Sequence, residues 1–118
     1  GYVLRLLSIP YRVEVRCRVS LDVIVGETGE AKSLIGYAEN VSEGGMLVSL
    51  PEPLDAGATV LLGFRLSHDS PFLTVNAEIV RVTTRNEDGL YVAAIQFNES
   101  EAKAREAVLR FVERALAG

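Results

Sequence analysis

Two short groups of polar residues have types and spacings suited to binding an anion or a purine base. Arg12 and Arg16 form an R-x-x-x-R pair, and Asn40-x-Ser42-x-x-Gly45 follows in a segment rich in turn-forming residues. A guanidinium group can pair with phosphate oxygens, bind O6 and N7 of guanine through two hydrogen bonds, or stack on a purine face. Asn40 offers an amide donor and acceptor, Ser42 a hydroxyl, and Gly45 a place where a ligand can approach the backbone. Together these groups predict a binding site.

Each motif also has a simpler explanation. The R-x-x-x-R spacing recurs at Arg81/Arg85 and at Arg110/Arg114, and roughly one such pair is expected by chance in a chain with this arginine content. The second motif can be an ordinary turn with glycines at positive φ, and its pattern should arise in about one such chain in twenty. The two motifs in this order are much rarer than either alone, which favours the binding site.

The sequence gives little support for a catalytic site or a metal site. The single histidine, His68, lies beside Asp69 and Ser70 in a polar loop, and adjacent loop residues rarely converge as a Ser-His-Asp triad. Cys17 is the only cysteine, which excludes a disulfide within the chain and a site with several thiolates. We therefore expect no catalytic residues, no metal site and no cofactor.

Length, charge and hydropathy limit the possible functions further. The chain has 118 residues, a formal net charge of −4 and a pI near 5.0, with 48% hydrophobic residues. These values predict one globular domain and argue against a general DNA or RNA binder, which needs a basic face. No stretch reaches the roughly 20 apolar residues of a membrane span, so we expect a cytoplasmic protein. Because the chain begins with Gly1, we expect it to be part of a longer protein.

Apolar and polar residues alternate with the period of a β-strand in several segments. The final segment changes to three- and four-residue spacing, with Asn98 and Glu101 as an expected capping box. Gly89 has a position in the last hairpin that suits positive φ. The pattern predicts a small antiparallel barrel or sandwich with a terminal helix against it. The expected strands are 16–25, 34–39, 46–50, 59–66, 72–83 and 90–97, and the expected helix is 99–117.

The two motifs in this order, about two dozen residues apart, resemble the PilZ domain family. Ala77-Glu78-Ile79-Val80-Arg81 is similar to the long strand of that family, and Val92-Ala93-Ala94-Ile95-Gln96-Phe97 to its closing strand. The resemblance implies a mainly β fold, a six-stranded antiparallel β-barrel with one C-terminal α-helix. It places the domain at residues 11–118 and leaves 1–10 as a linker or the end of a preceding segment.

The resemblance also implies a receptor for cyclic di-GMP. It assigns Arg12 and Arg16 to the guanine edges and phosphates of this ligand. Asn40, Ser42 and Gly45 are assigned to binding of the same ligand. A protein partner or an additional domain would then receive the signal. The alternative is a PilZ-like adaptor that works without ligand, through contacts with other proteins.

The sequence departs from the family pattern at two places. Tyr11 stands where a second basic residue is frequent, which argues against a stacked ligand dimer. Ala93 and Ala94 stand where glycine is frequent on the closing strand, and we expect them to crowd the site slightly.

Residues 1–12 contain Ser8 and Pro10 and no strand-length alternation, so we expect this segment to become ordered when the ligand binds. The prediction is strong new protection from hydrogen exchange over residues 3–16 when cyclic di-GMP is added. If protection appears only around residues 40–45, the N-terminal segment is a passive tether and the signal leaves by another route.

Overall fold

The computed structural model of the protein describes residues 16–83 and 87–117. Tyr11, Arg12, Arg85 and the expected linker 1–10 lie outside these ranges. Arg16 and the whole of the second motif lie inside them.

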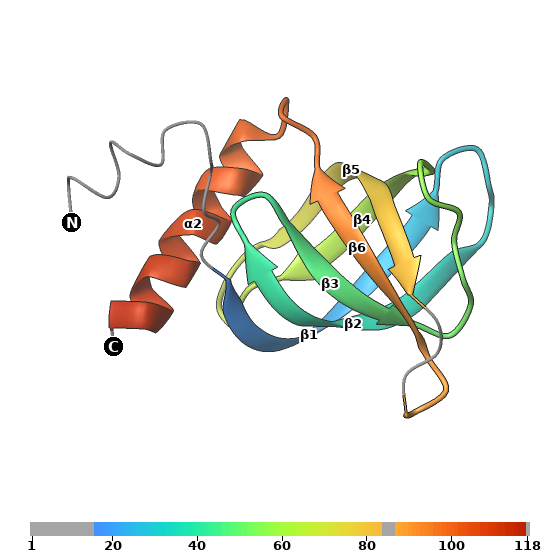
Figure 1. The fold of residues 1–118 in the computed structure, drawn as a ribbon. Helices are drawn as coiled ribbons and strands as arrows, with labels where there is room; N and C mark the ends of the chain where they lie inside the picture. The colour runs from blue at the N-terminus through green and yellow to red at the C-terminus, as the bar shows by residue number, and fades with distance from the viewer. Residues whose placement is uncertain (1–15, 84–86, 118) are drawn as a thin grey trace, which may run out of the picture.

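Six antiparallel strands form a closed barrel in the order β1-β2-β3-β6-β5-β4 (Figure 1). The predicted six-stranded barrel with a C-terminal helix is therefore confirmed. The strands are β1 (Cys17–Glu27), β2 (Ser33–Ser42), β3 (Gly45–Leu50), β4 (Thr59–Arg65), β5 (Phe72–Thr83) and β6 (Tyr91–Phe97), and the helix is α2 (Ala102–Ala117).

The period-two pattern places one set of apolar side chains inside the barrel. In β1, Val23 and Val25 are buried, whereas Ile24 between them is exposed. Phe64 and Phe97 are also buried, and their stacked rings have centroids 6.0 Å apart. Such an aromatic pair adds about 0.5–1.5 kcal/mol to the free energy gained by burying the rings.

The helix begins later than the sequence predicts. α2 starts at Ala102, and the carboxylate of Glu101 accepts hydrogen bonds from the backbone N–H and the side-chain amide of Asn76 on β5. The expected capping box between Asn98 and Glu101 is therefore wrong, because Glu101 ties the start of the helix to the barrel instead.

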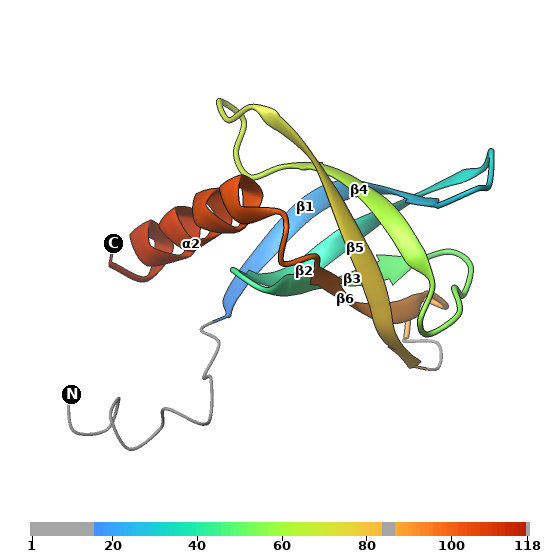
Figure 2. The ribbon, with the colours of Figure 1, turned by 90° about the horizontal axis from the view of Figure 1, so that it is seen from above.

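The apolar stripe of α2 covers one side of the barrel. Ala104, Val108 and Val112 are buried, and the helix contacts β1 and β2. The view from above shows α2 beside the barrel, near the start of β1 (Figure 2). Within the described residues, no helix is long and apolar enough to cross a membrane.

Two kinds of glycine shape the barrel. Gly89 has a φ of 78°, which confirms the positive φ predicted for the last hairpin. Gly36 on β2 has no positive φ, but a Cβ atom there would lie 2.2 Å from the carbonyl oxygen of Ser49 on β3. The two strands approach each other closely because position 36 has no side chain.

We predict that Gly36→Ala lowers the free energy of unfolding by roughly 1–3 kcal/mol, because the added methyl group meets backbone that cannot move aside easily. Chemical denaturation would measure the loss. Gly26→Ala is the matched control, since its Cβ would meet only the Ser33 hydroxyl, at 3.3 Å. Equal stability of the two variants would contradict the close approach of β2 and β3.

Candidate functional site

The second sequence motif forms the end of β2, the turn and the start of β3. Ser42 pairs with Gly45 across this turn and is completely buried. Its Oγ accepts a hydrogen bond from the backbone N–H of Gly44 at 3.3 Å and donates one to the carbonyl of Gly45 at 3.4 Å. In this structure the Ser42 hydroxyl therefore holds the turn together and does not point to solvent.

Gly45 also has a structural reason to be glycine. A Cβ atom at this position would lie 2.0 Å from the carbonyl oxygen of Ile95 and 3.1 Å from the Cα of Gln96, both on β6. The close approach that this residue permits is therefore that of β6. Gly45 still borders the surface hollow described below.

Arg16 and Asn40 bring the two sequence motifs together. Nη1 of Arg16 donates a hydrogen bond of 2.6 Å to Oδ1 of Asn40. Arg16 is exposed and lies just before β1, while Asn40 is half-buried and pairs with Arg18 in the β1–β2 ladder. A contact between residues 24 positions apart places the arginine beside the turn, as a shared site requires.

Arg81 is a candidate site residue that the sequence analysis set aside as a chance match. The β5–β6 register shifts between Ile79 and Arg81, so Val80 and Arg81 are both exposed although they are neighbours. A β-bulge produces this arrangement and often redirects a side chain at a functional site. The signal in the sequence was the dipeptide Val80-Arg81, at which the alternation of apolar and polar residues along this long strand is interrupted.

A surface hollow of about 280 Å³ joins Arg16 and Arg81. Asn40 pairs with Leu47 on β3, and Ala94 on β6 pairs with both Leu47 and Arg81. Asn40 and Arg81 therefore stand at the two ends of a row of paired residues that crosses four strands. Neighbouring strands in such a row lie about 4.8 Å apart. The hollow is lined by Arg16, Gly44, Gly45, Val80, Arg81, Ala94, Ile95 and Gln96.

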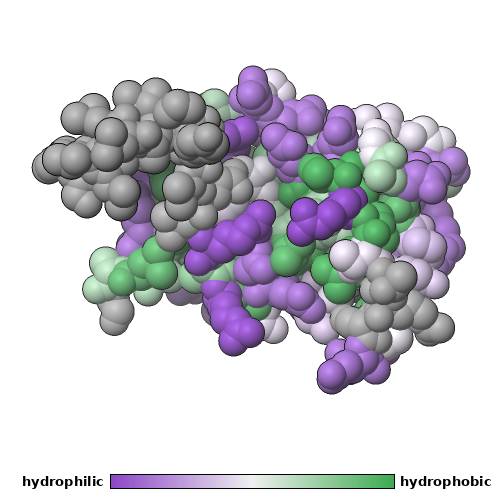
Figure 3. All heavy atoms as spheres, viewed as in Figure 1, coloured by the Kyte–Doolittle hydropathy of each residue, from purple (hydrophilic) through white to green (hydrophobic). Residues whose placement is uncertain are grey.

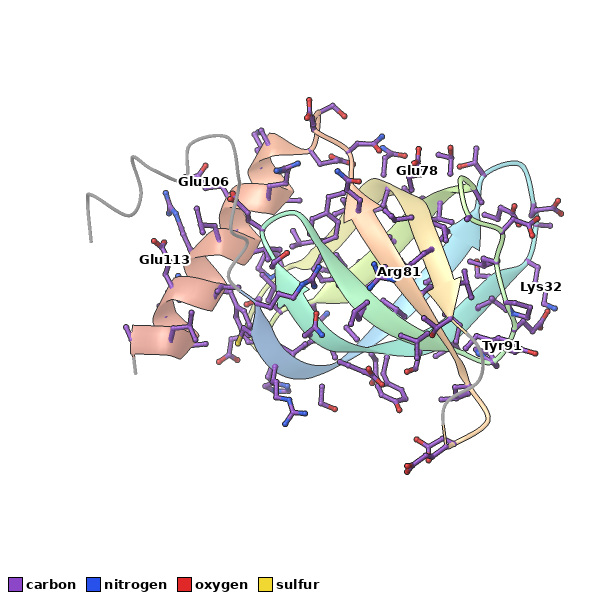
Figure 4. All side chains as sticks on the ribbon, in the orientation of Figure 1. Lys32, Glu78, Arg81, Tyr91, Glu106 and Glu113 are labelled. Carbon is purple, nitrogen blue, oxygen red and sulfur yellow. The ribbon has the colours of Figure 1, made fainter. Side chains whose placement is uncertain are left out.

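The figures show how the face over β3, β6 and β5 is composed. Arg81 lies near its middle, and Glu78 lies at its upper edge (Figure 4). Hydrophobic and strongly hydrophilic side chains alternate over this face (Figure 3). No acidic residue is among those that line the hollow. The hollow therefore combines the apolar side chains of Val80 and Ala94 with two guanidinium groups, which suits an anion that also carries flat rings.

The two alanines of β6 differ in their position. Ala93 is 1% exposed and belongs to the core, so the expectation that it crowds the site is wrong. Ala94 is half-buried and lines the hollow. Of these two alanines, only Ala94 therefore borders the hollow, and it does so with a methyl group.

The described residues supply little for catalysis or metal binding. His68 is exposed in the β4–β5 loop, and the hydroxyls of Ser67 and Ser70 are hydrogen-bonded to each other at 2.5 Å. No group of three or more His, Cys, Asp or Glu residues within 16–83 and 87–117 is arranged to hold a metal ion.

Comparison with protein families identifies the domain. A family model for the PilZ domain matches residues 10–114. The chain belongs to the PilZ family. Domains of this family typically bind cyclic di-GMP and are generally receptors without catalytic activity.

Solved structures share this PilZ fold. Bacillus subtilis inhibitor of motility (MotI/DgrA) matches with a TM-score of 0.75 and 22% identity, over 91% of this chain and 51% of that chain. The PilZ domain of YcgR from Escherichia coli, solved with c-di-GMP, matches with a TM-score of 0.72 and 12% identity, over 91% and 92%. The K. pneumonia MrkH–c-di-GMP complex matches with a TM-score of 0.65 and 19% identity, over 90% of this chain and 50% of that chain.

This chain therefore spans about half the length of MotI/DgrA and of MrkH. Comparison with curated proteins finds no match.

We predict that Ser42→Ala destabilises this PilZ domain by about 1–3 kcal/mol, because it leaves buried backbone groups of the turn without their hydroxyl partner. Thermal and chemical unfolding would measure the change. Ser33→Ala, at the exposed start of the same strand, is the control and should change stability by less than about 0.5 kcal/mol. A Ser42 variant as stable as this control would show that the hydroxyl does not hold the turn.

Proposed function

We propose that this domain binds cyclic di-GMP on the outer face of β3, β6 and β5 and transmits the binding to a partner or a neighbouring domain. The observation that carries the proposal is the hydrogen bond between Arg16 and Asn40. It joins the two motifs of the family resemblance beside a hollow that also contains Arg81.

The chemistry of the hollow supports a cyclic dinucleotide. The guanidinium groups of Arg16 and Arg81 can pair with phosphate oxygens or with O6 and N7 of guanine, and can stack on the base. Arg12 lies outside the described residues and, by its spacing from Arg16, would add a third guanidinium group. Ala94 leaves room for the ligand on β6, because its side chain is only a methyl group.

Ser42 has an indirect role in this proposal. Its buried hydroxyl fixes the turn, so the turn presents Asn40 and the backbone of Gly44 and Gly45 to the ligand. A direct bond from Ser42 to the ligand would require the turn to open.

The output would follow from the position of the arginines in the chain. Arg16 immediately precedes β1, so a ligand that holds Arg12 and Arg16 would also hold the segment before the barrel. We propose that this ordering of the N-terminal segment changes the position of whatever is attached to it. No chemical step is needed for such a signal.

The second candidate function is an adaptor that needs no ligand. One observation favours it: apolar side chains are exposed on the part of the barrel made by β1, β2 and β4. Ile24 and Ile35 are cross-strand partners with exposed fractions of 44% and 73%, and Leu61 is 44% exposed. Exposed apolar patches of this kind often mark contacts with other proteins.

We predict that Arg16→Ala and Arg81→Ala each weaken binding of cyclic di-GMP by roughly 10- to 100-fold, the effect of losing one charge-assisted contact pair. Isothermal titration calorimetry would measure the dissociation constants. Arg65→Ala is the matched control, because Arg65 is an exposed arginine on β4, outside the hollow.

Stability of all three variants should remain close to that of the unchanged protein, since each side chain is exposed. Absence of any binding by the unchanged protein would favour the adaptor. Equal affinities of the Arg81 and Arg65 variants would remove Arg81 from the site.

A further inference from the structure

A second hollow, of about 470 Å³, lies next to the proposed site on the outer face of β1 and β2. Asn40 links it to the first hollow, because this side chain lines the second hollow and accepts the hydrogen bond from Arg16, which lines the first. The two hollows therefore meet at the Arg16–Asn40 bond. The residues that line the second one are Arg18, Val19, Ser20, Tyr37, Glu39 and Asn40.

A bulge in β2 places two polar residues at this hollow. The β2–β3 register shifts between Ala38 and Asn40. Ala38 and Val41 are buried in the core, whereas Glu39 and Asn40 between them are both half-buried. The carboxylate and the amide therefore follow each other directly at the same surface.

The carboxylate of Glu39 is held in one place. Its Oε1 accepts a hydrogen bond of 2.9 Å from Oγ of Ser49, and Ser49 is completely buried. Among residues 16–83 and 87–117, Glu39 has no ion-pair partner and no second side-chain hydrogen bond. A fixed acceptor with a spare oxygen suits a neutral ligand group that donates N–H bonds.

Arg18 and Tyr37 complete the chemistry of the hollow. Arg18 is exposed and forms no ion pair with Glu39 in the described part of the chain, so its donors are available beside the carboxylate. Tyr37 is half-buried and supplies an aromatic side chain to the same lining. A donor fork, a fixed acceptor and an aromatic ring are the groups that a purine base needs for recognition.

We propose that this second hollow is a guanine-reading subsite, an inference that rests on the proposed function. Guanine donates from N1–H and N2–H₂ on one edge, which matches the carboxylate of Glu39. It accepts at O6 and N7 on another edge, which matches the guanidinium of Arg18. Tyr37 packs against the base, while the phosphates remain with the arginines of the first hollow.

Adenine differs at both edges, although it shares the N7 acceptor with guanine. It has an amino group in place of O6, an acceptor in place of N1–H and no amino group at C2, so Arg18 would face a donor beside N7 and Glu39 would face an acceptor. A site built on buried or fixed polar partners rejects such a base strongly, because those partners are left unpaired. We expect the unchanged protein to bind cyclic di-AMP at least about tenfold more weakly than cyclic di-GMP.

The test is Glu39→Gln, which retains an oxygen for Ser49 and replaces the spare oxygen by an amino group. Calorimetric titrations with cyclic di-GMP and with cyclic di-AMP would be compared. Affinity for cyclic di-GMP should fall by roughly 10- to 100-fold, whereas affinity for cyclic di-AMP should stay the same or rise. The preference between the two dinucleotides should nearly disappear.

Two further variants separate base recognition from charge and folding. Glu78→Gln removes the same charge from an exposed position on β5 outside both hollows, and it should leave the preference unchanged. Arg18→Met retains the length of an exposed side chain but removes its donors, and it should reduce the preference even if Glu39→Gln folds poorly.

The outcomes distinguish this inference from the proposed function. An unchanged protein that binds neither dinucleotide overturns both. A preference that survives in Glu39→Gln and in Arg18→Met overturns the subsite and leaves cyclic di-GMP binding intact. Equal weakening for both dinucleotides in these variants also overturns it, because the residues would then act on shape or charge alone.

Discussion

The contact between β3 and β6 closes the barrel, and the candidate site depends on it. Gly45 approaches the carbonyl of Ile95 so closely that no side chain fits between them. This pairing joins the first three strands of the chain to its last strand. It places the β2–β3 turn next to β6, and β6 in turn pairs with β5. Residues from opposite ends of the domain therefore share one face only because the barrel is closed.

Bulges decide which side chains this face presents. Regular strands send alternate residues inward, so a polar group is normally flanked by buried ones. The shifts at Ala38/Asn40 and Ile79/Arg81 place consecutive residues outside the core. The bulges thus bring Asn40 and Arg81 to the surface at two ends of one paired row. The cost is local loss of ladder pairing, which the rest of the barrel can tolerate because its core is continuous.

The sequence predicts the strands better than it predicts the direction in which individual side chains point. Alternation along the chain was enough for the six strands, because burial of one face is a property of each strand alone. Ser42 points inward because of a turn, and Arg81 points outward because of a bulge. Both features are determined by pairing with residues that lie elsewhere in the chain. The same dependence explains the wrong capping box, since Glu101 bonds to Asn76 of β5. Motif order put Arg16 and Asn40 forward for one candidate site, and the structure has these two side chains hydrogen-bonded, whereas the exposure of Arg81 became visible only in the fold.

The charge distribution suits a small anion better than a long one. The chain carries a net charge of −4, and a polyanion lying over a large area would meet this excess of acidic groups. Over distances beyond about 8 Å salt screens such charges, so a compact ligand responds mainly to the hollow that it enters. The first hollow has two arginines and no acidic residue in its lining, whereas the second has Arg18 beside Glu39. A ligand with a central pair of phosphates and flanking bases matches this order, because its anionic part would meet only cations and its neutral base would meet both a donor and an acceptor.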